Sequence, residues 1–191
     1  IDSKFGFSIQ TGDAETAIKW ALNAEHLELI GLHFHLGSPI FELEPYTAAT
    51  DLVLRFAAQF REDGLNLREF SPGGGFAIAY TRDQVPPEIS DYASSIVSTM
   101  TATCEELGME YPKLLIEPGR SIIGPAGVAL YKVGAIKDIP GVRKYVSVDG
   151  GMGDNIRPAL YQASYEVISA AQADEDGDDK VTIAGKYCES G

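Results

Sequence analysis

Three polar segments that could do chemistry follow strand-like runs in the first two thirds of the chain. They are HFHLGS (33–38), SPGGGF (71–76) and EPGR (117–120), and they follow the runs 29–32, 67–70 and 114–116. Short apolar runs punctuated by glycine and proline are typical of buried strands. Parallel α/β proteins keep their chemistry at the carboxyl ends of such strands. We therefore predict that the three segments share one site.

The glycine run 73–75 is the first candidate for ligand binding. Without Cβ atoms, its backbone N–H groups could close on an anion, and the hydroxyl of Ser38 could donate to the same anion. A plain tight turn is the alternative. The spacing matches neither the dinucleotide nor the P-loop pattern, so those ligands are disfavoured.

The histidines at 33 and 35 share a face if the strand continues through them. Zinc binding is one interpretation, but no third ligand cluster lies nearby in the sequence, so no metal site is predicted. We favour the flat imidazole of His35 lying against a flat cofactor ring. For His33 we expect a packed, hydrogen-bonded histidine.

The carboxylate of Glu117 has two possible roles at its strand end. It could pair with Arg120, or it could hold the protonated nitrogen of a heteroaromatic ring. In the second case Arg120 is available to bind a carboxylate or phosphate through its guanidinium fork.

The last third of the chain adds two candidates. Arg157 and Tyr161 follow the glycine turn VDGGM (148–152) and could clamp an acid group, or they could be a surface arginine and a packed tyrosine. The thiol of Cys188 could give a proton to a carbanion, although a small buried cysteine is the alternative. We expect Cys104, inside a helix, to be buried.

The elements that position these residues follow from periodicity. We predict helices at 13–23, 45–63 and 89–107 and strands at 27–34, 67–70 and 113–116, an alternation that indicates parallel βαβ units. Asp13 is expected to cap the first helix, and Gly64 and Gly108 to end the other two. The expected buried stripes are Leu52, Phe56 and Phe60 on the second helix and Tyr92, Ile96 and Met100 on the third.

The pattern changes near residue 125. Beyond it we predict strands at 128–133, 144–148, 165–169 and 181–184, with no helix of useful length. These runs indicate a second, mostly antiparallel β domain.

Composition limits the function classes. The 191 residues carry a net charge of -13, which argues against nucleic acid or an anionic membrane as a partner. No apolar run approaches the roughly 20 residues that a membrane span needs. The acidic run 174–179 has the character of a solvated loop and lacks the calcium-loop spacing. Two cysteines form no disulfide framework, which favours a reducing cytoplasm.

Seven motifs occur in an order that resembles a known family. They are KFGF (4–7), the HFHLGS, SPGGGF and EPGR segments, VDGGM, RPALY (157–161) and CESG (188–191). The chain resembles the pyridoxal-phosphate (PLP) decarboxylases of the alanine-racemase-like fold, which act on ornithine, arginine or diaminopimelate. RPALY and CESG favour the diaminopimelate branch. The resemblance implies an α/β fold: the C-terminal part of a PLP-binding (β/α)8 TIM barrel over 1–124, then the start of a mostly antiparallel β domain over 125–191.

The resemblance also implies roles. The cofactor-binding residues would be His35, Ser38, Gly74, Gly75, Glu117, Pro118, Gly119 and Arg120. The substrate-binding residues would be Arg120, Arg157, Tyr161 and Glu189. Within these sets, His35 would stack on the ring and Glu117 would pair with the pyridine nitrogen. Cys188 would supply the catalytic proton after carbon dioxide leaves.

The implied reaction is decarboxylation of meso-2,6-diaminopimelate to L-lysine, in a cytoplasmic homodimer with shared active sites. Action on ornithine, arginine or carboxynorspermidine is an alternative, as is a non-catalytic PLP-binding homologue. The family's cofactor-anchoring lysine lies on an early barrel strand, and no lysine here has that context. A late tyrosine is also missing. We therefore expect the chain to be an internal part of a longer enzyme and to be inactive alone.

Overall fold

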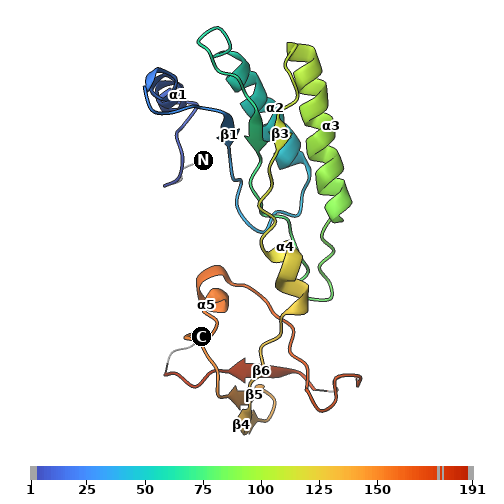
Figure 1. The fold of residues 1–191 in the computed structure, drawn as a ribbon. Coiled ribbons are helices and arrows are strands. Elements are labelled where there is room, and N and C mark those ends of the chain that lie inside the picture. The colour runs from blue at the N-terminus through green and yellow to red at the C-terminus, as the bar shows by residue number, and fades with distance from the viewer. Residues whose placement is uncertain (1–3, 176, 178, 189–191) are drawn as a thin grey trace. The chain divides into compact units, whose positions relative to one another are not determined.

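The computed structural model describes residues 4–175, 177 and 179–188, and the chain divides into two compact units (Figure 1). Unit 1 comprises Ile1–Ile78 and Val85–Pro125, and unit 2 comprises Ala79–Gln84 and Ala126–Gly191. The short segment Ala79–Gln84 therefore belongs by its contacts to unit 2, although it lies between two elements of unit 1. In the described part of the chain, no helix is long and apolar enough to cross a membrane.

Unit 1 is built from alternating helices and short parallel strands. Along the chain these are α1 (Asp13–Asn23), β1 (Gly31–His33), α2 (Glu44–Ala58), β2 (Glu69–Ser71), α3 (Ile89–Leu107), β3 (Lys113–Leu114) and α4 (Arg120–Ile123). The strands form a parallel sheet in the order β1-β2-β3. This arrangement confirms the predicted βαβ units. The strands are shorter than predicted, because much of 27–34 and 113–116 is extended chain outside the ladder.

The ends of α1 and α3 match the prediction, whereas α2 ends earlier. Helix α3 stops at Gly108, whose φ of 58° is the left-handed conformation that glycine accepts. Helix α1 is preceded by Gly12 without a side-chain cap, so Asp13 is its first helical residue and not its cap. Beyond Ala58 the chain forms tight turns up to Gly64, with Phe60 N–H donating to Ala57 O.

Two clusters of buried side chains form the core of unit 1. The first contains Ile18, Leu54, Phe56, Ala57, Phe60, Leu65, Leu67, Phe70, Met100 and Cys104. The second contains Tyr46, Phe76, Tyr92 and Ile96. The predicted stripe on α3 is confirmed, but Leu52 of α2 is 56% exposed and Leu54 is buried in its place. A helix repeats every 3.6 residues, so a strict four-residue stripe drifts off the buried face.

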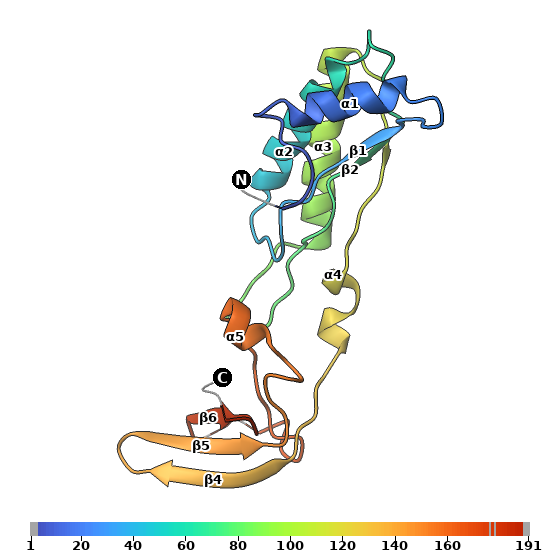
Figure 2. The same ribbon diagram turned by 90° about the vertical axis from the view of Figure 1, so that its left-hand side faces the viewer.

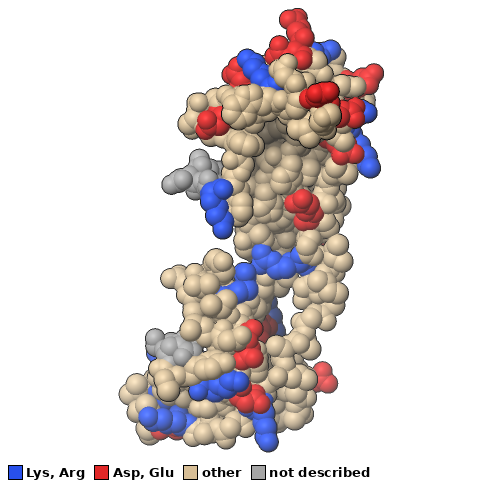
Figure 3. Space-filling model, turned by 60° about the vertical axis from the view of Figure 1, so that its left-hand side comes forward, with Lys and Arg blue, Asp and Glu red and all other residues tan. Residues whose placement is uncertain are grey.

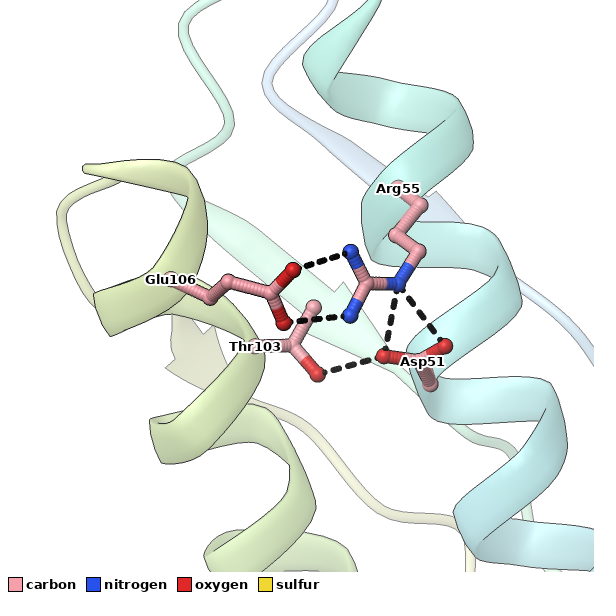
Figure 4. Close-up of polar contacts among 4 residues, drawn as sticks. All are labelled: Asp51, Arg55, Thr103 and Glu106. Carbon is pink, nitrogen blue, oxygen red and sulfur yellow. Dashed lines mark hydrogen bonds and ion pairs between the residues drawn. The ribbon is translucent and has the colours of Figure 1, made fainter.

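Helices α2 and α3 lie side by side and are joined by polar contacts as well as by the core (Figure 4). Arg55 donates through Nε to both oxygens of Asp51 at 3.0 and 2.9 Å, and through its terminal nitrogens to Glu106 at 2.9 and 2.6 Å. Thr103 Oγ1 donates to Asp51 Oδ1 at 2.8 Å. This network joins the two crossover helices through polar contacts, beside their apolar core.

Unit 2 is a three-stranded sheet with a short helix, seen from a second side in Figure 2. Its elements are β4 (Val133–Ile139), β5 (Arg143–Val148), α5 (Arg157–Tyr161) and β6 (Val181–Ala184), and η1 (Gly124–Ala126) links the two units. Strands β4 and β5 pair antiparallel, whereas β5 and β6 pair parallel. The predicted strand at 128–133 is wrong, because pairing starts at Val133. The predicted strand at 165–169 is not formed, and RPALY forms α5, which the sequence pattern did not indicate.

Candidate functional site

The carboxyl ends of β1, β2 and β3 meet at one edge of the sheet. Their parallel pairing continues beyond the strands as isolated bridges from Ile40 to Phe76 and from Gly74 to Glu117. Glu117 N–H also donates to Gly73 O at 2.8 Å. The HFHLGS, SPGGGF and EPGR segments therefore lie next to one another, which confirms that the three strand ends form one locus.

The glycine run is tight because neighbouring backbone fills the space of each missing Cβ. A Cβ on Gly74 would lie 1.8 Å from Glu117 O, and one on Gly75 would lie 2.1 Å from Gly37 O. Gly73 and Gly75 also have φ values of 73° and 92°, which favour glycine. A side chain at any of these positions would force the three strand ends apart.

Two buried tyrosines hold the carbonyl groups of this edge. Tyr46 of α2 donates its hydroxyl to Gly74 O at 2.7 Å, and Tyr92 of α3 donates to Ile40 O at 2.6 Å. Burial raises the pKa of Tyr46 to about 12, so its hydroxyl keeps its proton and stays a donor throughout the physiological range. These two core tyrosines thus hold the backbone at Gly74 and at Ile40 in place directly.

His35 is held by the glycine run. The N–H of Gly74 donates to His35 Nδ1 at 3.2 Å, so in the neutral ring the proton lies on Nε2. The N–H of Gly73 donates to Ser71 Oγ at 3.3 Å. Two of the three glycine amides are therefore engaged by the protein, and the His35 ring is exposed with a fixed tautomer.

Glu117 lies against His33 at the same edge. Its Oε2 is 3.4 Å from His33 Nε2, and both side chains are more than half exposed. The expectation that His33 is hydrogen-bonded is therefore confirmed, whereas the expectation that it is packed is wrong. The shared face of His33 and His35 was visible in the sequence, but the meeting of His33 with Glu117 depends on the strand order.

The EPGR segment directs Arg120 back toward β1. Gly119 has a φ of 50°, which lets the chain turn from the end of β3 into the short helix α4. The hydroxyl and N–H of Ser121 both donate to Pro118 O and close this turn. Arg120 then donates through a terminal nitrogen to Ser38 Oγ. A guanidinium and a hydroxyl are thus brought together at the strand ends, as an anion site requires.

A second cluster lies in unit 2 around Arg157. Its Nε donates to the hydroxyl of Tyr165 at 3.1 Å, and its guanidinium carbon lies 5.2 Å from the ring centre of Tyr161 and 5.8 Å from that of Tyr80. The structure therefore brings together the predicted pair Arg157 and Tyr161. Sequence reasoning missed Tyr80 and Tyr165, because neither has a motif that ties it to RPALY.

Cys188 is an exposed free thiol at the end of the described chain. The preceding Tyr187 packs on the VDGGM turn, where a Cβ on Gly151 would lie 2.8 Å from the Tyr187 ring. Lys186 N–H also donates to Gly150 O at 2.9 Å, which anchors the segment. Cys104 is fully buried, as expected, and burial raises the pKa of its thiol. Glu189 lies outside the described residues.

No group of three or more His, Cys, Asp or Glu side chains that could hold a metal ion occurs among the residues that the structure describes. At this edge the Arg120 guanidinium and the Ser38 hydroxyl lie together, beside the Glu117 carboxylate and the His35 imidazole. Residues 1–124 match the family described as "Pyridoxal-dependent decarboxylase, pyridoxal binding domain". The chain belongs to the pyridoxal-dependent decarboxylases.

Relatives of this decarboxylase chain extend the match over its whole length. It is 44% identical over 191 residues to a diaminopimelate decarboxylase of Bacillus subtilis (strain 168), covering 100% of this chain and 44% of that protein. A crystal structure of diaminopimelate decarboxylase from M. jannaschii in complex with L-lysine superposes with a TM-score of 0.89 at 37% identity. It covers 99% of this chain and 42% of the other. The chain thus spans less than half the length of these relatives.

A more distant decarboxylase shares the fold. The lysine/ornithine decarboxylase of Vibrio vulnificus, solved with cadaverine, has a TM-score of 0.75 at 26% identity and covers 98% of this chain and 48% of that chain. The family and these neighbours identify unit 1 as part of a TIM-barrel-type, PLP-binding domain. The three parallel strands and two crossover helices are its βα units.

The donors and the close backbone at the strand ends fit pyridoxal phosphate. Because Gly74 and Gly75 have no Cβ atoms, the backbones of neighbouring strand ends can pack directly against them. The paired Ser38 and Arg120 offer hydroxyl and guanidinium donors suited to a phosphate. The exposed carboxylate of Glu117 is suited to a protonated pyridine nitrogen. Cofactor binding is therefore consistent with the residues present.

Proposed function

We propose that the protein that carries this chain converts meso-2,6-diaminopimelate to L-lysine and carbon dioxide. The observation that carries this proposal is the convergence of the glycine run, Glu117 and Arg120 at one sheet edge, in a chain 44% identical to a diaminopimelate decarboxylase. The crystallised relative with bound L-lysine supports an amino-acid ligand.

The cofactor would be held by the three strand-end segments. Ser38, Gly74, Gly75 and the Pro118–Arg120 turn would bind its phosphate, and His35 would lie against its ring. Glu117 would accept a hydrogen bond from the pyridine nitrogen and keep that nitrogen protonated. When bound, pyridoxal phosphate accepts the electron pair released as the carbon–carboxylate bond breaks.

The remaining residues would hold the amino-acid end of the substrate that does not react. Arg157 would bind the carboxylate through its guanidinium, with Tyr161 beside it and Arg120 as a further cation. Glu189 would pair with the ammonium group. Holding this end orients the scissile bond at the other end of the substrate.

Cys188 would then provide the proton. After carbon dioxide leaves, the substrate carbon needs one proton. The thiol of Cys188 is exposed and could deliver its Sγ–H proton to that carbon. The family resemblance implies that the cysteine loop would enter the active site of the partner subunit. We therefore also propose a homodimer with shared active sites, in the cytoplasm.

A decarboxylase of another basic amino acid is the second candidate, favoured by the structural likeness to the lysine/ornithine decarboxylase. The gene product that carries this chain should be assayed with pyridoxal phosphate on meso-diaminopimelate, ornithine, arginine and carboxynorspermidine. We expect carbon dioxide and L-lysine from meso-diaminopimelate and slower turnover of the others. Preference for another substrate would establish the second candidate, and turnover of none would support a non-catalytic homologue.

The role of Cys188 is tested in the same protein. We expect Cys188→Ala to lower kcat by about 100-fold, the order of magnitude of a lost general acid, with little change in KM. Cys104→Ala is the matched control: it removes a buried thiol, so it should lower the melting temperature and leave kcat near that of the parent. An unchanged kcat in Cys188→Ala would show that another group delivers the proton.

A further inference from the structure

The guanidinium of Arg157 is enclosed by three tyrosines that come from two separate stretches of the chain. Tyr161 lies one turn along α5, Tyr165 follows the helix, and Tyr80 comes from the segment Ala79–Gln84. The rings of Tyr80 and Tyr165 also meet edge to face, with centroids 5.2 Å apart and an interplanar angle of 89°. The aromatic groups thus support one another as well as the cation.

An ion pair fixes the Tyr80 segment beside Tyr165. Arg82 Nε lies 3.0 Å from Glu166 Oε2, and the Arg82 N–H donates to Glu166 Oε1 at 2.5 Å. The carboxylate next to Tyr165 is therefore engaged by Arg82 and not by Arg157. In the described part of the chain, Arg157 has no acidic partner.

The bond to Tyr165 limits how Arg157 can bind an acid. A guanidinium can bind a carboxylate in two ways. It donates either through its two terminal nitrogens or through Nε and one terminal nitrogen. Here Nε is used by the Tyr165 hydroxyl, and within the described residues neither terminal nitrogen has a hydrogen-bond partner. The geometry therefore leaves the end-on approach through the two terminal nitrogens.

We propose that Tyr165 and Tyr80 are positioning residues that fix Arg157 for end-on binding of the substrate's non-reacting carboxylate. This inference rests on the proposed function and adds two residues to it. Tyr165 accepts from Nε and sets the rotation of the guanidinium plane. Tyr80 supports one face of that plane and links it to the segment that follows the glycine run. A flexible arginine held in this way loses less conformational freedom when the acid binds.

The test compares two ligands that differ by one carboxylate. L-Lysine and cadaverine share their carbon chain and both amino groups, but only L-lysine carries the acid. Binding of each to the pyridoxal-phosphate-loaded gene product is measured for the parent, Tyr165→Phe, Tyr80→Leu and Tyr80→Phe. We expect Tyr165→Phe to weaken L-lysine binding roughly five- to tenfold, a change of the size of one typical hydrogen bond. Cadaverine binding should change less than about twofold, because its contacts do not involve this bond.

Kinetics and a matched pair separate positioning from general damage. Tyr165→Phe should raise KM for meso-diaminopimelate more than it lowers kcat, and Tyr80→Phe, which keeps the ring, should restore most of what Tyr80→Leu loses. Tyr145→Phe is the control, because Tyr145 contacts Arg143 in the same unit at 5.8 Å but lies outside the cluster. Tyr145→Phe should leave the binding of both ligands and the KM for meso-diaminopimelate unchanged.

Three outcomes would overturn the proposal, and they are distinguishable. Equal weakening of L-lysine and cadaverine would indicate a structural role only. Normal L-lysine binding in Tyr165→Phe, together with weak binding in Arg157→Lys, would keep Arg157 as the acid ligand and reject the positioning role. A gene product that neither binds L-lysine nor turns over meso-diaminopimelate would reject the proposed function and this inference together.

Discussion

At the scale of single residues, the absence of a side chain on Gly74 lets two strand ends lie close together. Its position opposite Glu117 leaves no room for a methyl group, because the carbonyl oxygen of Glu117 already occupies that space. The same contact brings the Glu117 side chain to the edge where His33 and the glycine run meet. Steric fit and the candidate chemistry therefore depend on the same residue, through its backbone carbonyl and its side-chain carboxylate.

Gly74→Ala should damage both stability and cofactor binding. The methyl group must push the backbone of Glu117 away, and overpacking of this kind costs about 1–3 kcal/mol. We expect a lower melting temperature and a weaker affinity for pyridoxal phosphate, measured by absorbance titration of the gene product.

Gly108→Ala provides the comparison. Gly108 has a positive φ, unlike Gly74, and nothing lies within 4 Å of an added Cβ there. The Gly108→Ala substitution should therefore destabilise the fold by about 1–2 kcal/mol through backbone strain alone, at the far end of α3. If Gly108→Ala weakened cofactor binding as much as Gly74→Ala does, the loss in Gly74→Ala would come from global destabilisation and not from local crowding.

Several residues of the site could be read from the sequence, and others could not. His35, Ser38, Glu117 and Arg120 follow strand-like runs, so their shared location was predictable from the rule that parallel strands end at one edge. The contact between His33 and Glu117 depends on strand order and register, which no local pattern encodes. Tyr80 was missed for the same reason, because a long-range contact brings it to Arg157. Tyr165 is near Arg157 in the sequence, but the strand-like composition of 165–169 indicated a strand and not this contact.

At the scale of elements, the contact between α2 and α3 combines an apolar core with the Arg55 network (Figure 4). The guanidinium of Arg55 and the hydroxyl of Thr103 hold the pKa of Asp51 below its usual range. The same guanidinium lowers the pKa of Glu106. Both carboxylates are thus stabilised in their charged forms in the folded state.

The sign of the pH effect follows from these lowered pKa values. A carboxyl group with a lower pKa in the folded state stabilises the fold above its unfolded pKa and loses that contribution as pH falls through the folded pKa. The ordinary values are 3.8 for Asp51 and 4.5 for Glu106. The network should therefore contribute fully near neutral pH and progressively less below these values.

Arg55→Met removes the charged group that forms the network and keeps an unbranched side chain at this position. We expect a lower melting temperature than the parent's at pH 7, with a small difference because the groups are partly exposed. The difference should narrow as the pH is lowered through the range where Asp51 and Glu106 take up protons. A difference that stayed constant down to pH 3 would attribute the loss to packing and not to charge.

Helices were more predictable than strands in this chain. The ends of α3 follow from its 3.6-residue periodicity and from Gly108, both of which are local signals. In unit 2, the stretch 165–169 has strand-like composition, but Tyr165 and Glu166 contact Arg157 and Arg82 and pair with no strand. Helix α5 is only five residues long, too short to show a period.

At the scale of the whole molecule, acidic residues outnumber basic ones, with 28 Asp and Glu against 15 Lys and Arg. Figure 3 shows one face, where charged side chains of both signs are separated by wide uncharged areas. Ion pairs such as Lys19 with Glu15 use equal numbers of both signs, so they leave the net charge of -13 unchanged. Repulsion among the remaining carboxylates opposes the folded state, since folding brings them closer together.

Added salt should therefore stabilise the protein. Raising NaCl from 10 mM to about 150 mM shortens the Debye length from about 30 Å to about 8 Å, which screens repulsion between distant carboxylates. Ion pairs in contact, such as those of Arg55, are screened less because their N···O distances of 2.9 and 2.6 Å are far below the Debye length. We expect the melting temperature to rise with NaCl at pH 7 and the rise to shrink at pH 4.5, where part of the acidic excess is protonated. Chloride is the anion of choice, because sulfate resembles the phosphate of the proposed cofactor site. A melting temperature that fell with NaCl at pH 7 would mean that local ion pairs outweigh the net charge of -13.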